Sequence, residues 1–242
     1  MSEYIRPAIK SRVFYDENGR VIDYGARWPD SPPEESYSVT AHPERFAPLH
    51  TVVDALVQYL VNNYQVRVDE GVHLLETLGA REFSVPGPDE VDRVVRLTPN
   101  DGDCSPLSFI CTSYPGVRVA AGEFGVFYYP NCGCDACDET WDSAAQAMEE
   151  DALAVISGGY REMVDLIPLR KIGYQRSAGI SVGPGRTYGW EIKGPDMSFS
   201  RSSVGDASGI PVRTLKAVNK RLKELTKVTP NGYWKAWERR NA

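Results

Sequence analysis

Three stretches of the chain repeat apolar residues at intervals of three and four, which is the spacing of a helix that buries one face. They lie within residues 40–64, 139–155 and 211–227, and the glycine pair at 158–159 suits the end of the second. The pattern therefore predicts three helices. Their apolar stripes are Leu49, Val52, Val53, Leu56, Leu60 and Tyr64, then Trp141, Ala144, Ala145, Met148, Ala152 and Val155, and finally Leu215, Val218, Leu222 and Leu225.

Short apolar runs separated by turn residues fill the region between the first two helices. Four runs, at residues 91–97, 107–112, 117–120 and 126–129, recur at roughly ten-residue spacing, which is typical of an antiparallel meander. An earlier hairpin is predicted where residues 13–15 and 21–24 flank an Asn-Gly pair. Further short β-prone runs are at 173–174, 180–182 and 188–192, with a turn at 183–186, and residues 72–78 permit a short helix.

These elements predict an α+β fold. We expect an antiparallel sheet of about five strands with two main helices on one face, followed by a basic helical appendage at the C-terminus. The expected division is an α+β domain over residues 1–200, a small polar linker over 201–210 and a basic helical tail over 211–242.

Composition places the chain among ordinary soluble proteins. Its 242 residues are 42% hydrophobic and 25% charged, which is enough to form a substantial core. The sequence contains no run of about 18 apolar residues, and its first residues lack the apolar core of a signal peptide. We therefore expect a cytoplasmic protein that does not enter a membrane.

Charge is distributed unevenly along the chain. Residues 211–242 carry nine Lys or Arg and two acidic residues, whereas the rest carries 18 basic and 31 acidic residues. A basic tail on an acidic body is found in some nucleic-acid-binding proteins. However, the overall charge of −6 repels a polyanion at long range. We therefore favour docking of the tail on its own body, on a second copy or on another protein.

The candidate chemistry is concentrated at residues 132–137, where three of the five cysteines have the spacing C-x-C-x-x-C. Three thiolates this close can face one metal ion, and zinc in a structural site takes four ligands. The predicted ligands are Cys132, Cys134 and Cys137, with His42 or His50 as the fourth. Other candidates for the fourth position are Cys104, Cys111, Asp135 and Asp138.

Two other interpretations of this cluster stay open. The cysteines can be a redox pair, or inert thiols in a turn, because a reducing compartment disfavours a disulfide framework. Nearby acidic residues disfavour an isolated thiolate and favour a bound cation, whereas the predicted helix that follows lowers the pKa of Cys137. An iron–sulfur cluster would need Cys104 or Cys111 as its fourth ligand.

The functional hypotheses belong to two classes. The favoured one is a non-enzymatic binding or adaptor protein with a structural zinc site. The alternative is an enzyme, either a metal-dependent hydrolase or a thiol or iron–sulfur redox enzyme. No H-E-x-x-H, G-x-S-x-G or nucleotide-binding glycine motif is present, and three thiolates make zinc a poor Lewis acid. The sequence therefore leaves catalysis undecided and names no substrate.

Four stretches carry a resemblance. They are Y-G-A-R-W at 24–28, the run from His42 to His50, Y-P-G-V at 114–117 and C-G-C-D-A-C-D-E at 132–139. Over residues 13–192 the chain resembles a family of uncharacterised actinobacterial proteins with a CGCDACDE signature. The resemblance implies that the cysteine cluster is a feature of that family, and it implies no activity. The basic segment after Pro211 lies outside it.

Overall fold

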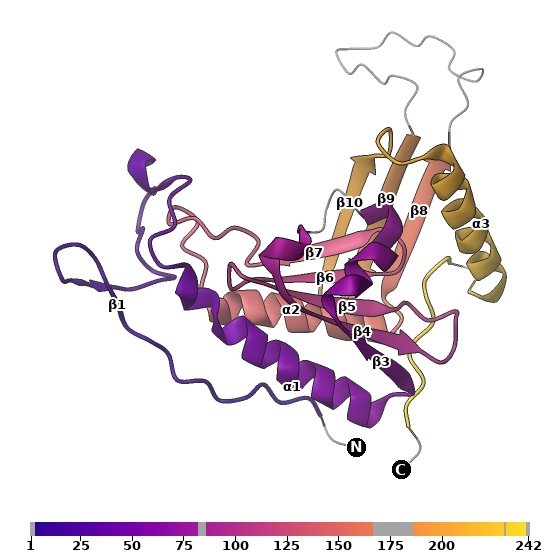
Figure 1. Ribbon diagram of the computed structural model, residues 1–242, viewed down its shortest axis with the longest axis horizontal. Coiled ribbons are helices and arrows are strands. Elements are labelled where there is room, and N and C mark those ends of the chain that lie inside the picture. Colours follow the sequence, from indigo (N-terminus) through magenta and orange to yellow (C-terminus); the bar gives the residue numbers. More distant parts are fainter. Residues whose placement is uncertain (1–2, 82–85, 167–185, 230, 241–242) are drawn as a thin grey trace, which may run out of the picture.

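The computed structural model describes residues 3–81, 86–166, 186–229 and 231–240. Its centre is an antiparallel sheet whose strands follow one another in chain order, β3-β4-β5-β6-β7 (Figure 1). The strand bounds are β3 (Val66–Glu70), β4 (Val91–Pro99), β5 (Leu107–Thr112), β6 (Val117–Ala121) and β7 (Gly125–Tyr129). The predicted meander and the α+β class are confirmed.

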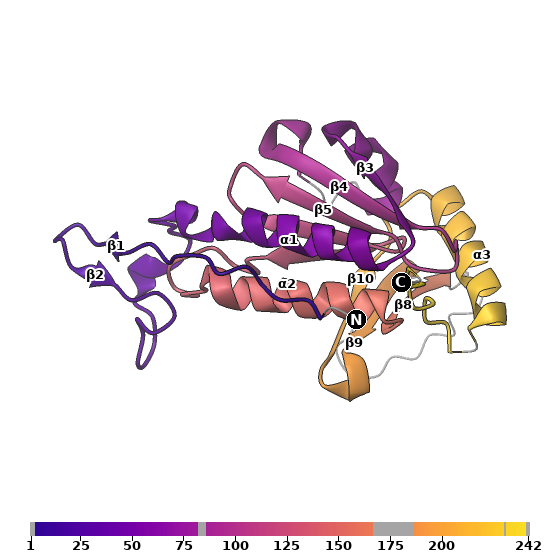
Figure 2. The same ribbon diagram turned by 90° about the horizontal axis from the view of Figure 1, so that it is seen from below.

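Two helices cover one face of this sheet. They are α1 (Pro48–Asn63) and α2 (Trp141–Ile156), which lie side by side in Figure 2. Their apolar stripes share one core with alternate strand residues such as Leu97, Phe109 and Val119. The opposite face holds a smaller cluster, in which Val94, Ile110 and Ala120 meet leucines of the 3-10 helix η3 (Val72–Arg81). The prediction of two main helices on one face is confirmed.

A second sheet, which the sequence predicts only in part, crosses the first near the start of β7. It consists of β8 (Tyr160–Leu166), β9 (Arg186–Lys193) and β10 (Ser200–Asp206), in the order β10-β9-β8. Strand β9 includes the predicted run 188–192. Strand β10 corrects the expected linker, because residues 200–206 pair with β9 along their whole length. The predicted runs at 173–174 and 180–182, and most of the turn at 183–186, lie outside the described residues.

The C-terminal segment packs against the body. Helix α3 (Val212–Val228) contacts β8, and its four apolar stripe residues belong to the main core. The segment after it adds two buried tryptophans, Trp234 and Trp237, to the same core. The predicted docking of the apolar stripe on the chain's own body is confirmed, whereas the division into two domains stays a prediction.

An N-terminal arm, defined here as residues 13–46, extends from one end of the body in Figure 1. It contains the predicted hairpin, β1 (Phe14–Tyr15) and β2 (Val21–Ile22), and the short 3-10 helices η1 (Glu34–Ser36) and η2 (Pro43–Phe46). Other short helices in the described residues are η4 (Pro88–Glu90) and η6 (Pro195–Met197). Within the described parts of the chain, no helix has the length and apolar character that crossing a membrane requires.

Candidate metal centre

The three clustered cysteines lie in the cysteine turn, defined here as residues 131–139, which joins β7 to α2. Their sulfur atoms all lie within 4.8 Å of one another. Cys132 and Cys134 are half-buried, and Cys137 is exposed. The turn therefore brings together the three thiols that the spacing predicts as ligands, at a surface that a metal ion can reach.

Backbone hydrogen bonds from the arm fix the path of this turn. The N–H of Asp135 donates to the carbonyl of Val39 at 2.7 Å, and the N–H of Ala136 donates to the carbonyl of Ser36 at 3.0 Å. On the other side of the turn, Arg45 donates from Nη2 to the carbonyl of Gly133 at 2.9 Å. The turn and the arm are thus ordered by the same contacts.

Asp138 is the side-chain anchor between the two segments. Its Oδ2 accepts hydrogen bonds from the backbone N–H groups of Gly25 and Arg27, both at 2.9 Å. Its Oδ1 accepts a third from Nε of Arg27 at 2.6 Å. Asp138 itself has a φ of 51°, a conformation that Asp tolerates better than most residues. These bonds place the exposed Cys137 beside the arm.

Glu139 and Thr140 connect the cysteine turn to α2. The carboxylate of Glu139 accepts hydrogen bonds from the N–H groups of Asn131 at 3.2 Å and Cys132 at 3.1 Å. Thr140 then caps the helix, since its Oγ1 accepts from the N–H of Ser143 at 3.1 Å. The turn is therefore closed at its base before the helix begins.

Gly133 lies at a close approach between two segments. A Cβ at this position would lie 1.9 Å from the hydroxyl oxygen of Tyr114. Tyr114 in turn packs against Phe46, with ring centroids 6.3 Å apart. A larger residue at position 133 would therefore require the Tyr114 side chain to move, so glycine between Cys132 and Cys134 permits this contact.

The thiols influence one another's protonation. Sγ of Cys132 lies 3.2 Å from Sγ of Cys134, and this hydrogen bond is the main cause that lowers the pKa of Cys134 to about 7. The hydrogen bonds of Cys137 to Cys132 and Cys134 raise its pKa to about 12, so the expected lowering of this pKa by the following helix is wrong. One thiol of the group is thus readily ionised near neutral pH, whereas another keeps its proton in the absence of a cation.

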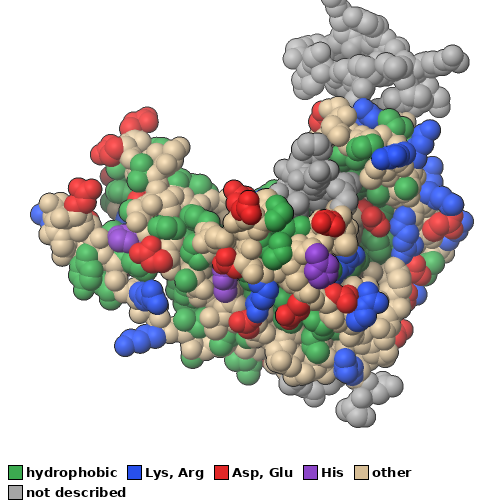
Figure 3. Space-filling view, in the orientation of Figure 1, with side chains coloured by type: hydrophobic (Ala, Val, Ile, Leu, Met, Phe, Trp, Pro, Cys, Tyr) green, Lys and Arg blue, Asp and Glu red, His purple; other side chains and the backbone are tan. Residues whose placement is uncertain are grey.

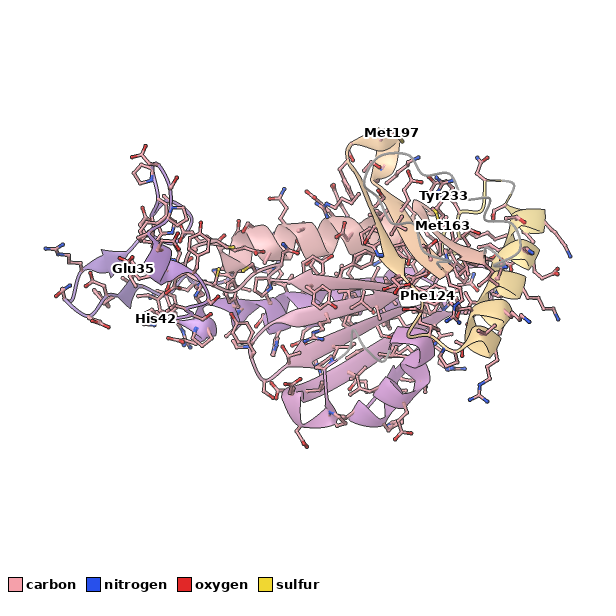
Figure 4. The ribbon with its side chains drawn as sticks, turned by 90° about the horizontal axis from the view of Figure 1, so that it is seen from above. Glu35, His42, Phe124, Met163, Met197 and Tyr233 are labelled. Atoms are coloured by element: carbon pink, nitrogen blue, oxygen red, sulfur yellow. The ribbon has the colours of Figure 1, made fainter. Side chains whose placement is uncertain are left out.

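The histidines predicted as the fourth ligand have other partners. Nδ1 of His42 lies 3.0 Å from Glu44 Oε1, and its Nε2 lies 3.1 Å from the carbonyl of Tyr15. His42 belongs to the arm, where Figure 4 labels it. Nε2 of His50 lies 3.1 Å from the carbonyl of Gly116. Among the described residues, the group of metal-binding atoms contains the three cysteines and neither histidine, so ligation by a histidine stays a prediction.

The other candidate ligands are also held elsewhere. Cys104 and Cys111 are buried in the main core, and burial is the first cause that raises the pKa of both thiols, to about 11 for Cys104. The carboxylate of Asp135 accepts from the N–H of Ala41 at 3.2 Å and forms an ion pair with Arg45. Asp138 is engaged as described above. Among the described residues, the structure therefore brings together only Cys132, Cys134 and Cys137 from this set, as a group that could hold a metal ion.

Two arginines and a tyrosine support the centre in ways that the sequence does not predict. The guanidinium groups of Arg27 and Arg45 both lie 4.4 Å from the ring centroid of Tyr24. Both arginines also donate to backbone carbonyls of the cysteine turn, at Asp135 and Gly133 respectively. In the sequence, the signal that could have identified Tyr24, Arg27 and Arg45 is the resemblance. Its four stretches, at 24–28, 42–50, 114–117 and 132–139, converge at the cysteine turn.

Comparisons with known proteins identify a family. The model of the "Family of unknown function (DUF6226)" matches residues 10–241, which is nearly the whole chain. Neither the search of curated proteins nor that of solved structures gives a match. The match supports the expectation of an uncharacterised family. It corrects the extent of the resemblance, because it includes the basic segment after Pro211.

Proposed function

The chain belongs to the family of unknown function DUF6226, and we propose that it is a non-enzymatic binding or adaptor protein with a structural zinc site. The observation that carries the proposal is the group of three sulfur atoms within 4.8 Å at Cys132, Cys134 and Cys137. Tetrahedral zinc holds thiolates at about 2.3 Å, which separates the sulfur atoms by about 3.8 Å. Small side-chain rotations satisfy that geometry.

The surroundings support a structural role for the ion. The cysteine turn holds the arm through Asp135, Ala136 and Asp138, so a metal ion that fixes the turn also fixes the arm. Three thiolates donate much electron density to zinc, which weakens it as a Lewis acid and disfavours the hydrolase alternative. In this proposal, His42 or His50 supplies the fourth ligand after a local shift.

Thiol redox chemistry is the second candidate. It is favoured by the 3.2 Å separation between Sγ of Cys132 and Sγ of Cys134, and by the pKa of about 7 of Cys134. In that case the two thiols would form a disulfide, with loss of two protons and two electrons to an oxidised thiol partner. The thiolate of Cys134 would attack the partner's disulfide, and Cys132 would then displace the partner thiol from the resulting mixed disulfide.

Elemental analysis of protein purified without oxygen separates these two candidates. We expect about one zinc per chain, and substitution of Cys132, Cys134 or Cys137 by Ser lowers zinc affinity at least about tenfold. Cys104→Ala and Cys111→Ala are matched controls, because they remove cysteines outside the group. Well under one metal ion per chain, after reconstitution with zinc, would contradict the structural site. Reversible joining of Cys132 to Cys134 in that metal-free protein would support the redox candidate.

The proposal also includes the signature of the family, the origin and location of the protein, and the fourth ligand. The resemblance supports the CGCDACDE stretch as a mark of the family and an actinobacterial origin. The free state of the five cysteines supports a reducing location such as the cytoplasm. Replacement of His42 or His50 by Ala tests the fourth ligand, since loss of a ligand weakens zinc binding as much as loss of one cysteine.

A further inference from the structure

A cleft of about 460 Å³ lies where the two sheets meet. Strand β7 forms one side, β9 and β10 form the opposite wall, and α2 also contributes to the lining. The lining includes Phe124, which directly precedes β7 and is labelled in Figure 4, and Asn131, which follows the strand. The cleft therefore extends from the junction of the sheets to the cysteine turn. Its volume is within the range of sites that bind small molecules.

Four aromatic rings meet at this cleft. Tyr188 and Trp190 are two positions apart on β9, so both side chains point to the same face of the second sheet. Tyr188 packs against Phe124 with ring centroids 5.1 Å apart, and Trp190 meets Phe127 edge to face at 4.8 Å. The two phenylalanines are buried, whereas Tyr188 and Trp190 are half-buried. The phenylalanines therefore fix the orientation of two rings that still offer surface to a ligand.

The positive charge in the cleft is already balanced. Arg201 forms ion pairs with Asp151 and Glu150 of α2. Asp151 is 4% exposed, and it also accepts a hydrogen bond from the Tyr129 hydroxyl at 2.5 Å. The guanidinium of Arg201 lies 4.7 Å from the ring centroid of Phe199. Because two carboxylates hold this guanidinium, it does not favour an anionic ligand.

Glu139 supplies a negative charge that the protein does not balance. Its carboxylate is half-buried and accepts hydrogen bonds from the N–H groups of Asn131 at 3.2 Å and Cys132 at 3.1 Å. Peptide N–H groups are neutral, and no basic side chain of the described residues forms an ion pair with Glu139. With Asp151 and Arg201 paired, the charged residues of the lining carry one excess negative charge.

The aromatic rings and the carboxylate favour the same sign of charge in a ligand. The face of an aromatic ring carries negative potential, so it attracts a cation. A carboxylate attracts the same cation more strongly where water is partly excluded. A neutral ligand of equal size would gain only the apolar contacts, and an anionic one would be repelled by Glu139.

We propose that the cleft binds a small organic amine in its ammonium form, with an aromatic or branched apolar group attached. The apolar group packs against Trp190 and Tyr188, and the ammonium group lies at the end of the cleft that Glu139 lines. This inference goes beyond the proposed adaptor role and does not depend on a metal ion at the cysteine turn.

Three probes with the same phenyl group and different charges test the proposal on the full-length protein. They are phenethylamine, phenethyl alcohol and phenylacetate, which are cationic, neutral and anionic near neutral pH. A nuclear magnetic resonance titration follows the indole N–H signal of Trp190, which is assigned by its loss in Trp190→Phe. We expect the amine to shift this signal and to bind at least about tenfold more tightly than the other two probes. Equal affinities, tighter binding of the alcohol or the acid, or no shift with the amine would overturn the proposal.

Replacement of Glu139 tests the origin of the preference for a cation. Glu139→Gln should reduce the advantage of the amine over the alcohol at least about threefold. Retained binding of the alcohol shows that the cleft itself is intact in this variant. Glu76→Gln is the matched control, because Glu76 is exposed and lies outside the cleft. An unchanged advantage in Glu139→Gln would overturn the placement of the ammonium group.

Two variants of β10 locate the binding site. Ser203 is exposed and lines the cleft, so Ser203→Trp fills it and weakens binding of the amine at least about tenfold. Ser202→Trp is the matched control, because Ser202 is exposed and points to the opposite face of the same strand. Equal loss in both variants, or full binding by Ser203→Trp, would overturn this location. Titrations with zinc and with a chelator keep this test separate from the metal proposal.

Discussion

Buried carboxylates in this protein bind groups that are distant in the sequence. Glu162 accepts from the N–H groups of Glu123, Phe124 and Gly125 and from Nε1 of Trp234. In the sequence, Glu162 is one charged residue in a short stretch without an alternating apolar pattern. The three neighbouring cysteines were predictable as a group, because their separation along the chain is small. The carboxylates were not, because tertiary contacts give each its role.

Asp151 provides a prediction at this scale. Burial is the largest cause that raises its pKa above the ordinary 3.8, against the lowering effects of Tyr129 and Arg201. The folded state therefore holds the carboxyl proton of Asp151 more tightly than the unfolded state does. The stabilisation that results is present at low pH and is lost as the pH rises through the folded pKa. Asp151→Asn should make the free energy of unfolding decline less steeply above pH 3.8.

Urea unfolding across a pH series measures this effect. Asp165→Asn, at an exposed position on β8, controls for the amide substitution itself. An unchanged pH slope in Asp151→Asn would contradict the assignment.

At the scale of elements, periodicity predicted the three long helices and strands β4 to β7 of the first sheet, whereas β3 lies outside the predicted runs. The bounds of β5 agree with the expected run 107–112, and α2 covers nearly all of its predicted range. Strand β10 was missed because S-R-S-S-V-G-D has few apolar residues, and its pairing with β9 supplies the structure that its composition does not. The arm likewise takes its shape from the cysteine turn rather than from an apolar pattern of its own.

Contacts between the arm and the cysteine turn lead to a second prediction. Asp138→Ala removes the acceptor of three hydrogen bonds from Gly25 and Arg27. Loss of a charged, largely buried acceptor costs about 1–3 kcal/mol, which is enough to increase local opening at least about fivefold. Limited proteolysis should therefore cut the arm faster, while the helical circular dichroism of the body is retained.

Asp30→Ala, which removes an exposed acid from the same arm, is the control for this experiment. Equal cleavage rates in both variants would show that Asp138 does not hold the arm. Repeating the proteolysis with zinc and with a chelator also tests whether a metal ion at the turn stabilises the arm.

At the scale of the whole molecule, the acidic body and the basic tail are complementary. Exposed basic residues of α3 gather at the right of Figure 3, whereas its apolar stripe faces the core. Arg221 forms an ion pair with Asp103, and Lys235 forms one with Asp101. The exposed basic residues of α3 are Arg213, Lys216, Lys220, Lys223 and Lys227. Because the tail contributes to the core, nucleic-acid binding is better tested by charge reversal than by deletion.

That charge reversal is the third prediction. Glutamate at Lys216, Lys220 and Lys223 changes three exposed side chains, so the fold is retained. If the tail only packs against the body, we expect the wild type and the variant to bind duplex and single-stranded nucleic acid equally weakly. Tight binding by the wild type that falls steeply with salt, and is lost in the variant, would contradict this preference.

Trp237 tests whether the C-terminal segment unfolds with the body. Its side chain is 4% exposed, its Nε1 donates to the carbonyl of Ser105 at 2.8 Å, and its ring lies 6.0 Å from that of Tyr64. Trp237→Ala should therefore cost about 3–5 kcal/mol and shift a single urea transition of the whole chain. Trp28→Ala, at a half-buried position in the arm, should have a smaller effect.

If residues 211–242 form an independent domain, the urea transition of the body in Trp237→Ala should stay where it is in the wild type. Circular dichroism and tryptophan fluorescence, followed together, distinguish these outcomes because a shared core requires the two signals to change at the same urea concentration.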